Sequence, residues 1–518
     1  MKKLPIGKQD LPALIGDGYV YVDKTEYIYR LLDAGPYLFL SRPRRFGKSL
    51  LISTLYEIFR GNKALFKGLW IEDKIDWAPY PVIRVDFNEI DYRVQPLEYA
   101  LSRQMDDIAA QYGLEIPGEQ TSKDKFSHLL ETLGSSDKKA VVLIDEYDKA
   151  ITDFLGEDEE RIRENVRTLK NFYGTLKSLD RYIHFVFITG VSKYGRVSIF
   201  SDLNNLNDIT IHPDFAVLLG WTQEEMERYF DDRLSDLARH FKLDRSDLLE
   251  NIRAYYNGYS WDGEHRVYNP YSLLNFFHHK AFRNFWFATG TPTFLTKLLR
   301  QQLIPAYELE NFRANDFLLE SADVHHIGLH ALMLQTGYFT IQKITLSRDL
   351  SPLYHLGYPN REVRLSFLQN ILAAYLDRPV DVTDVTLTQR MRRFLAEGDL
   401  PNFFALLSSI FASVPYQITR TEESYFHSVT HVVLALTGHV VHSEIPTNQG
   451  RMDAVLDAGE RVYIFEFKLR ESADAALAQI HERGYPERFR AAGKPLTLVG
   501  VAFDVEAKNV REWKAVEG

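Results

Sequence analysis

The sequence predicts an α/β protein of several domains, with a mainly parallel sheet in the N-terminal part and a smaller α/β domain at the C-terminus. Three observations support this prediction. The chain has 518 residues, which is too long for one hydrophobic core. Short apolar runs alternate with amphipathic helical segments through residues 1–215, and strand-like runs return after residue 415. We therefore expect domains at residues 1–215, 216–300, 301–414 and 415–518.

Composition excludes several classes of protein. With 45% hydrophobic and 25% charged residues, the chain is neither disordered nor dominated by membrane spans. The 61 Lys and Arg against 71 Asp and Glu give a formal charge of -10, so any nucleic-acid binding must use local basic patches. The absence of cysteine excludes disulfides, thiolate catalysis and Cys-ligated zinc. No apolar run approaches about 18 residues, and we expect a cytoplasmic protein with no membrane partner.

The N-terminal sheet is predicted from four buried, β-rich runs separated by helices. The runs are residues 37–40, 82–87, 140–144 and 184–189. This order is typical of a parallel sheet covered by helices on both faces. The helix after the first run has its core-facing side chains at Leu51, Leu55, Ile58 and Phe59.

The turn after the first predicted strand, in SRPRRFGKSL, is a candidate phosphate-binding loop. Gly47, Lys48 and Ser49 stand at the start of a helix, whose free backbone N–H groups bind anions. The lysine reaches the outer phosphates, and the serine hydroxyl completes a magnesium shell. The glycine usually found five residues before Gly47 is replaced by Arg42, so a basic turn capped by Ser49 is the alternative. The other candidate nucleotide contacts in this loop are Arg44, Arg45, Phe46 and Leu50.

A second nucleotide motif follows in KAVVLIDEYDK. Asp145 ends an apolar strand, where its carboxylate can hold magnesium, and Glu146 can polarise the attacking water. The alternative is that adjacent acids merely end a strand. Two motifs in the right order, each at a strand end, favour the nucleotide site.

A third strand ends in TGVSK, where Thr189 or Ser192 is a candidate sensor of the γ-phosphate. Arg44, Arg45, Lys193 and Arg196 are candidates for neutralising charge in the transition state. For each of them the alternative is an ordinary solvated loop residue.

These motifs carry a resemblance to a known family. YVDKT, LFLSRPRRFGKSLL, YPVIRVDF, VVLIDEYDK, ITGVSK and SIFSDLNNLNDIT resemble the AAA-ATPase-like family that is commonly fused to a PD-(D/E)XK nuclease domain. The resemblance spans residues 5–275 and implies a P-loop NTPase fold of the AAA/ASCE type. It also implies ATP and Mg²⁺ at Lys48, Ser49, Asp145 and Glu146, a loop that lacks its first glycine as a family trait, and the YVDKT segment near the adenine.

The middle of the chain is predicted to be mostly helical. Residues 216–300 are rich in aromatics and read as a helical lid. Residues 301–414 hold a helix followed by the strand-like segments GYFTIQKI and PLYHLGY, an order compatible with a winged-helix-like element.

The segment GRMDAVLDAGERVYIFEFK predicts a β-hairpin that carries a carboxylate site. Pairing brings Asp453 beside Glu466 and Lys468, which share one strand face because they are two residues apart. Two carboxylates bind a hard divalent cation, and a lysine orients water or offsets charge on the phosphate. The alternative is a buried salt-bridge cluster. Glu423 at the start of a helix, and Gln479 with Tyr485 on another, are further candidates.

Residues 415–505 resemble the PD-(D/E)XK nuclease domain, which has a restriction-endonuclease-like α/β fold. The resemblance assigns Asp453, Glu466 and Lys468 to the catalytic triad, with Mg²⁺ or Mn²⁺, and Glu423 and Gln479 to the flanking helical positions. His427 follows Glu423 by one helical turn, and we interpret it as an ordinary half-buried histidine.

Two functions remain open from the sequence. The first is an ATP-regulated, metal-dependent nuclease acting on nucleic acid, with DNA favoured over RNA. The second is an ATP-driven signalling or assembly switch that uses the nuclease fold as effector or binding platform. A nucleic-acid-binding protein with two inactive folds is disfavoured by the intact Glu146 and Lys468. We also expect a homo-oligomer in which residues 255–271 and Arg196 complete a neighbour's ATP site.

Overall fold

The chain was analysed as a computed structural model, which describes residues 1–116, 118, 120–135, 138–193, 199–200, 203–286, 312–316, 319, 322–323, 326–327, 329–376, 382–412, 423–447, 450–490 and 493–518. It divides into two compact units. The first comprises Met1–Gly290 and Phe312–Val363, and the second comprises Thr291–Asn311 and Arg364–Gly518. The domain boundaries predicted from the sequence at residues 215, 300 and 414 remain predictions.

The first unit is built on a five-stranded, all-parallel sheet. Its strands are β1 (Tyr37–Ser41), β2 (Val82–Asp86), β3 (Ala140–Asp145), β4 (Ile183–Gly190) and β5 (Asn207–Asp208). They are arranged in the order β2-β3-β4-β1-β5. The four predicted strands are confirmed to within one residue at each end. Because all strands run the same way, the phosphate loop after β1 and the acids after β3 lie at one edge of the sheet.

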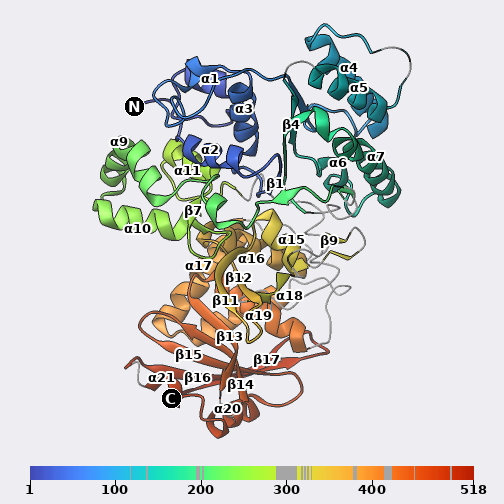
Figure 1. Cartoon of the computed structure of the whole chain (residues 1–518). Coiled ribbons are helices and arrows are strands. Elements are labelled where there is room, and N and C mark those ends of the chain that lie inside the picture. Colours follow the sequence, from blue (N-terminus) through green and yellow to red (C-terminus); the bar gives the residue numbers. More distant parts are fainter. Residues whose placement is uncertain are drawn as a thin grey trace. The chain divides into compact units, whose positions relative to one another are not determined.

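Helices cover both faces of this sheet. Figure 1 shows α3 on one side and α4, α5 and α7 on the other. The buried face of α3 contains all four predicted core residues. The helical segments of this region are α1 (Leu11–Gly16), α2 (Thr25–Asp33), α3 (Lys48–Phe59), η1 (Lys63–Phe66), α4 (Leu97–Gln111), α5 (Ser122–Gly134), α6 (Lys149–Thr152), α7 (Glu159–Ser178), η2 (Asp180–Tyr182) and η3 (Pro213–Phe215).

A helical subdomain follows the sheet in the first unit. It consists of α9 (Gln223–Phe241), α10 (Arg245–Tyr256), the short ribbon β6 (Asn257–Tyr259) and β7 (Val267–Tyr268), and α11 (Pro270–His279). Helix α9 begins at a capping box between Thr222 and Glu225. Its core is aromatic: Phe230 stacks on Phe277 with ring centroids 4.8 Å apart. The expected helical segment after the sheet is therefore present.

The first unit also contains a helix and a hairpin in the predicted order, followed by a helix that continues into the second unit. These are α15 (Leu329–Thr336), β11 (Thr340–Leu346), β12 (Pro352–Gly357) and α16 (Arg361–Leu376). The hairpin pairs with β8 (Phe312–Ala314) in an antiparallel sheet, and β9 (Ala322–Asp323) pairs with β10 (His326–Ile327). The winged-helix-like character of this part remains a prediction.

The second unit is a mixed sheet with helices. The sheet order is β13 (Val440–Thr447), β14 (Gly450–Asp457), β15 (Val462–Lys468), β16 (Leu496–Asp504) and β17 (Asn509–Glu517). Only β15 and β16 run parallel among these neighbours. Its helices are α17 (Val382–Glu397), α18 (Leu400–Ala412), α19 (Glu423–Leu436), α20 (Ala473–Glu482) and α21 (Glu487–Arg490). An α/β fold in both units confirms the predicted fold class.

Helix α20 packs closely on β15 and β16, on the face of the sheet opposite α19 (Figure 1). Ile480 of α20 belongs to one apolar cluster with Ile464 and Leu498 of the sheet. A close contact occurs at Gly500, where an added Cβ would overlap the carbonyl oxygen of Ala473 in the first turn of α20. The helix therefore lies as near to β16 as a bare backbone allows.

Candidate functional sites

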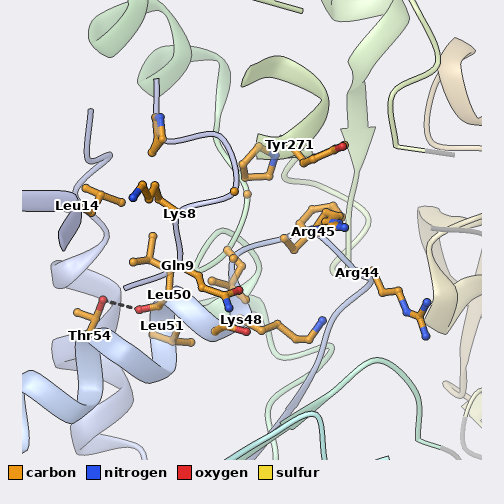
Figure 2. A pocket seen from close by; sticks show the side chains of 18 of the residues that line it. Lys8, Gln9, Leu14, Arg44, Arg45, Lys48, Leu50, Leu51, Thr54 and Tyr271 are labelled. Carbon is orange, nitrogen blue, oxygen red and sulfur yellow. Dashed lines mark hydrogen bonds between the residues drawn. The ribbon is translucent and has the colours of Figure 1, made fainter. Parts of the chain in front are cut away.

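The phosphate loop lies between β1 and α3, where the sequence predicts it. Gly47 caps α3 in the left-handed conformation with φ of 92°, which glycine adopts without steric cost. All seven predicted loop contacts, residues 44–50, line one cavity of about 590 Å³. Glu146 and the N-terminal residues Lys8 and Gln9 line the same cavity, and Figure 2 shows Lys8, Gln9 and Lys48 around it. The loop and the acidic motif are thus brought to one site.

Lys48 is buried and bonded to its own loop. Its Nζ donates to the carbonyl oxygens of Arg42, at 3.0 Å, and Pro43, at 3.1 Å. Burial lowers the pKa of Lys48, and the nearby carboxylates of Glu146 and Asp145 partly oppose that shift. The ammonium group is therefore poised in the loop with acceptors that a phosphate oxygen can replace.

Asp145 is the most unusual charged group of this site. Its side chain is fully buried at the end of β3, and neither carboxylate oxygen has a hydrogen-bond partner in the part of the chain that the structure describes. Burial raises the pKa of Asp145 to about 6, although the Ser49 hydroxyl lies near enough to lower it in part. Asp86, paired in register with it on β2, adds to the rise. A cation beside Ser49 would compensate this carboxylate.

Glu146 has an unusual backbone conformation. Its φ of 53° is left-handed, which is uncommon for a residue with a side chain. The side chain lines the cavity, and its Oε2 lies 3.8 Å from Nζ of Lys149. The turn after β3 therefore directs Asp145 and Glu146 to different places, one inside the protein and one into the cavity.

The side chains of the third predicted motif, TGVSK, bond to protein groups outside the cavity. Thr189 is fully buried within the sheet and donates its hydroxyl to the carbonyl oxygen of Leu40 at 2.9 Å. Ser192 donates its hydroxyl to Asp148 at 2.7 Å, and Nζ of Lys193 lies 2.7 Å from a carboxylate oxygen of Asp208. These groups are not among the residues that line the cavity. Arg196 lies outside the described residues, so the sensor and charge-neutralising roles remain predictions.

The YVDKT segment lines the cavity through Tyr21, Val22 and Lys24. Lys24 does not extend freely into it, because its Nζ bonds to Glu225, at 2.6 Å, and to the carbonyl oxygen of Val217, at 2.8 Å. This ion pair joins the N-terminal segment to the first turn of α9. The segment therefore borders the candidate nucleotide site, and its contact with adenine remains a prediction.

Sequence reasoning placed Tyr271 only within residues 255–271, expected to complete a neighbour's ATP site, and did not name Asp86. Tyr271 at the start of α11 lies against the guanidinium of Arg45, 5.0 Å from its ring centroid, as Figure 2 shows, whereas Arg44 points away from this pair. Asp86 could have been found, because it ends an apolar strand as Asp145 does. Tyr271, more than 200 residues from the loop in sequence, lines the cavity of its own chain, and its role at a neighbour's site remains a prediction.

The second candidate site lies on β15 and α20. Glu466 is 1% exposed, accepts a hydrogen bond from Nε2 of Gln479, and lies 3.8 Å from Nζ of Lys468. Lys468 donates to Oε1 of the same Gln479 at 2.6 Å. The glutamine amide therefore bridges the carboxylate and the ammonium group. Tyr485, whose pKa is raised chiefly by burial, is also close to Gln479, Glu466 and Asp453.

Asp453 lies beside this group on β14. Ala454 pairs with Phe465, so Asp453 stands across from Glu466, as the predicted hairpin register requires. One oxygen of its carboxylate accepts from the backbone N–H of Phe467 at 2.8 Å. His427 is buried, and its Nε2 lies 3.0 Å from the carbonyl oxygen of Asp453. Helix α19 begins at Glu423 as predicted, but the Glu423 side chain is outside the described residues.

The donor set of this second site fits a hard divalent cation only in part. Within the described residues, no three His, Asp or Glu side chains are grouped closely enough to hold a metal. Asp453 and Glu466 supply two carboxylates, and Mg²⁺ in phosphate-processing sites commonly uses one or two carboxylates together with water and substrate oxygens. The lysine–carboxylate arrangement is therefore compatible with a cation, and compatible also with a structural cluster.

Together, the fold and these arrangements define a protein class. A parallel sheet carries a phosphate loop after β1 and an Asp-Glu pair after β3, with β4 between these two strands, which is the design of a P-loop ATPase domain. The mixed sheet with Asp, Glu and Lys on a hairpin is that of a PD-(D/E)XK domain.

Comparisons with known proteins agree with this class. A family model described as a predicted AAA-ATPase matches residues 5–200, and a model of the PD-(D/E)XK nuclease superfamily matches residues 421–513. A protein of Azotobacter chroococcum mcd 1, described as an uncharacterized protein in the vnfD 5' region, is 38% identical over 521 residues, covering 98% of each chain. The chain belongs to the AAA-ATPase-like family, in the form that carries a C-terminal PD-(D/E)XK nuclease superfamily domain.

None of the helices in the described part of the chain has the length and apolar composition needed to cross a membrane.

Proposed function

We propose that this protein binds and hydrolyses ATP with Mg²⁺ and that its C-terminal domain is a metal-dependent nuclease acting on nucleic acid, with DNA favoured over RNA. Lys48 and the backbone N–H groups at the start of α3 bind the phosphates, and Ser49 and Asp145 hold the cation. Glu146 orients and polarises the attacking water. We place the protein in the cytoplasm.

The observation that carries the ATPase assignment is the buried carboxylate of Asp145. A fully buried carboxylate is costly, and proteins keep such groups where a ligand compensates them. Asp145 lies behind Ser49, and the loop lysine and Glu146 line the cavity. Bound Mg²⁺ would neutralise this carboxylate and the phosphate charge together. These features are the reason to prefer the nucleotide site over a basic turn.

The nuclease assignment is supported by the chain of contacts from Glu466 through Gln479 to Lys468. In our proposal Asp453 and Glu466 hold Mg²⁺ or Mn²⁺, with Glu423 as a further acid. Lys468 orients water and offsets charge on the scissile phosphate, and Gln479 fixes the directions of both neighbours. The cation supplies charge neutralisation at the phosphodiester.

A second function, an ATP-driven switch, is favoured by one connection of the phosphate loop. The indole N–H of Trp286 donates to the carbonyl oxygen of Arg44 at 3.2 Å. The backbone N–H of the same tryptophan donates to Glu362 in the first turn of α16 at 2.7 Å. These two hydrogen bonds link the phosphate loop to the start of α16, so a rearrangement of the loop would shift the start of this helix. In this alternative the nuclease fold is the effector or a binding platform.

A cleavage assay tests both sites together. The purified chain is incubated with labelled single- and double-stranded DNA and RNA, with and without ATP, in Mg²⁺ or Mn²⁺. Glu466→Gln should abolish cleavage, whereas Asp474→Asn, which removes an exposed carboxylate of α20 paired with Lys514, should not. No cleavage of any substrate by the wild-type protein would contradict the nuclease proposal.

ATP turnover separates the two functions. ATP hydrolysis that accelerates with DNA or RNA supports a nucleic-acid-coupled ATPase, and tight ATP binding without such stimulation supports the switch. We further propose a homo-oligomer in which residues 255–271 and Arg196 complete a neighbour's site.

A further inference from the structure

Arg42 occupies the place where a phosphate loop usually has its first glycine, and the structure gives this arginine a position of its own. The residue is 1% exposed and directly follows β1. Its backbone N–H donates to the carbonyl oxygen of Gly190, which extends the pairing of β1 with β4 by one residue. The side chain is thus directed into the protein and away from solvent.

The guanidinium of Arg42 binds the backbone of three separate segments. It donates to the carbonyl oxygen of Ser41 at 2.9 Å, of Thr210 at 2.6 Å and of Phe215 at 3.1 Å. These acceptors lie at the end of β1, after β5 and in η3. Because the planar guanidinium has five N–H donors in a fixed geometry, one side chain can hold all three segments in register.

An aromatic group from the β6–β7 connection completes this anchor. The ring of Trp261 lies over the guanidinium of Arg42, with the ring centroid 4.0 Å from its central carbon. Phe46 of the phosphate loop is also buried, and its ring meets Tyr259 at 4.8 Å and Trp261 at 5.3 Å edge to face. Aromatic residues of β6 and the β6–β7 connection therefore contact the loop at two positions, Arg42 and Phe46.

Burying the charge of Arg42 costs the fold free energy. No carboxylate forms an ion pair with Arg42 in the described residues; Asp208 and Asp262 act on it only from a distance, and Asp208 already pairs with Lys193. Burial consequently lowers the pKa of Arg42 to about 9. The three carbonyl acceptors and the Trp261 ring offset the cost of burying this charge.

The backbone of Arg42 connects the anchor to the nucleotide site. Lys48 donates to the carbonyl oxygens of Arg42 and Pro43, so the position of the loop backbone sets the position of the lysine ammonium group. Other phosphate loops reach their conformation through glycines, whereas here a buried side chain fixes the backbone from behind. Resting on the proposed ATPase function, we propose that Arg42, stacked on Trp261, is a positioning residue that holds the phosphate loop and Lys48 in the conformation that binds ATP.

Binding of a fluorescent ATP analogue with Mg²⁺ to the full chain tests this proposal. Arg42→Met should raise the dissociation constant by about tenfold or more, and the KM for ATP should rise more than kcat falls. The matched control is Arg266→Met. Arg266 also donates to two carbonyl oxygens, those of Ile341 and Gln342, and leaves the same β6–β7 connection, but it does not touch the phosphate loop. It should lower the melting temperature without changing the dissociation constant.

Two milder variants keep the test decisive if Arg42→Met does not fold. Arg42→Lys retains the charge but not the planar donor geometry, and Trp261→Phe retains an aromatic ring of smaller area. Each should weaken analogue binding by about threefold or more in protein that melts near the wild-type temperature. Trp77→Phe is the control for the tryptophan, since Trp77 packs against Phe66 with ring centroids 4.8 Å apart and its indole donates to the carbonyl oxygen of Glu72.

The outcomes separate this inference from the proposed function. If the wild-type protein binds the analogue and the Arg42 and Trp261 variants bind it equally well, Arg42 is only a structural residue and the inference is wrong. The same conclusion follows if Arg266→Met weakens binding as much as Arg42→Met. If the wild-type protein itself binds no nucleotide, the proposed ATPase function fails, and the inference fails with it.

Discussion

Replacing Lys468 by methionine should distinguish a catalytic lysine from a structural one. If the lysine is catalytic, the variant should bind metal more tightly and lose cleavage. If it only holds the site together, the variant should lose metal binding or keep cleavage. Lys468 Nζ lies 3.8 Å from a carboxylate oxygen of Glu466 and 2.6 Å from Oε1 of Gln479. Its side chain is 19% exposed, against 2% for Glu466. Methionine keeps much of the side-chain volume while removing the charge, so the change tests electrostatics more than packing.

The distance sets the size of the expected effect. Two unit charges about 4 Å apart interact by about 4 kcal/mol at an effective dielectric constant of about 20, before solvent screening at the exposed end of the lysine. In wild type the ammonium group competes with any cation for Glu466. Lys468→Met should therefore strengthen Mn²⁺ binding by about tenfold, a value discounted for screening, while cleavage falls at least about 100-fold. Losing the bond to Gln479 should cost about 1–3 kcal/mol of stability.

Mn²⁺ titration without nucleotide, a cleavage assay and thermal denaturation are run on the same preparations. Glu466→Gln should lose both metal binding and cleavage. Lys494→Met is the matched control, because Lys494 pairs with Asp457 at 2.7 Å at the other end of the same hairpin and is 35% exposed. It should keep wild-type cleavage and metal affinity. A Lys468→Met protein that still cleaves, or that loses Mn²⁺ binding as fully as Glu466→Gln, would refute the assigned role.

Three further results are expected. Lys48→Ala should weaken ATP binding because it removes the charge on the outer phosphates, whereas Glu146→Gln should retain binding and trap unhydrolysed ATP; equal binding loss in nucleotide titrations would contradict these roles. Burial raises the pKa of Glu362 from its usual 4.5 to about 7, so stability carried by its protonated form is present below about pH 4.5 and lost as pH rises through 7. Glu362→Gln should therefore stabilise the protein by up to about 3 kcal/mol in urea denaturation at pH 8, less at pH 5, and a pH-independent difference would disprove it. Light scattering should show a larger particle with a non-hydrolysable ATP analogue, and a monomer at every concentration would rule out shared sites.

Much of the sheet architecture could be predicted because buried strands need no long-range information to be recognised. The runs ending at Ser41 and Asp145 are apolar throughout and bounded by turn residues, and both were predicted to within one residue. Strands β5 and β17 were missed. The first has only two residues, and the second interleaves charged side chains with Val510 and Trp513, so neither shows a continuous apolar run.

The sites were predictable where spacing along one strand determines geometry. Glu466 and Lys468 share a face because they are two residues apart, and the hairpin register brings Asp453 opposite. What the sequence could not indicate are contacts made across long separations. The stacking of Trp261 on Arg42 joins residues more than 200 positions apart, and only the folded chain explains the arginine in a glycine position.

The near approach of α20 to β16 bears on how such domains are judged from genome sequences. A nuclease domain is commonly called active when its Asp, Glu and Lys are present. Here Gln479, which bridges Glu466 and Lys468, is carried by a helix whose distance from the sheet is set by Gly500. A mutation as small as Gly500→Ala is expected to push that helix outward and to displace Gln479 from Glu466 and Lys468 with every motif residue unchanged. The presence of the Asp, Glu and Lys motif residues therefore does not by itself indicate an intact site. The residue at the position of Gly500, beneath the helix, should be compared as well.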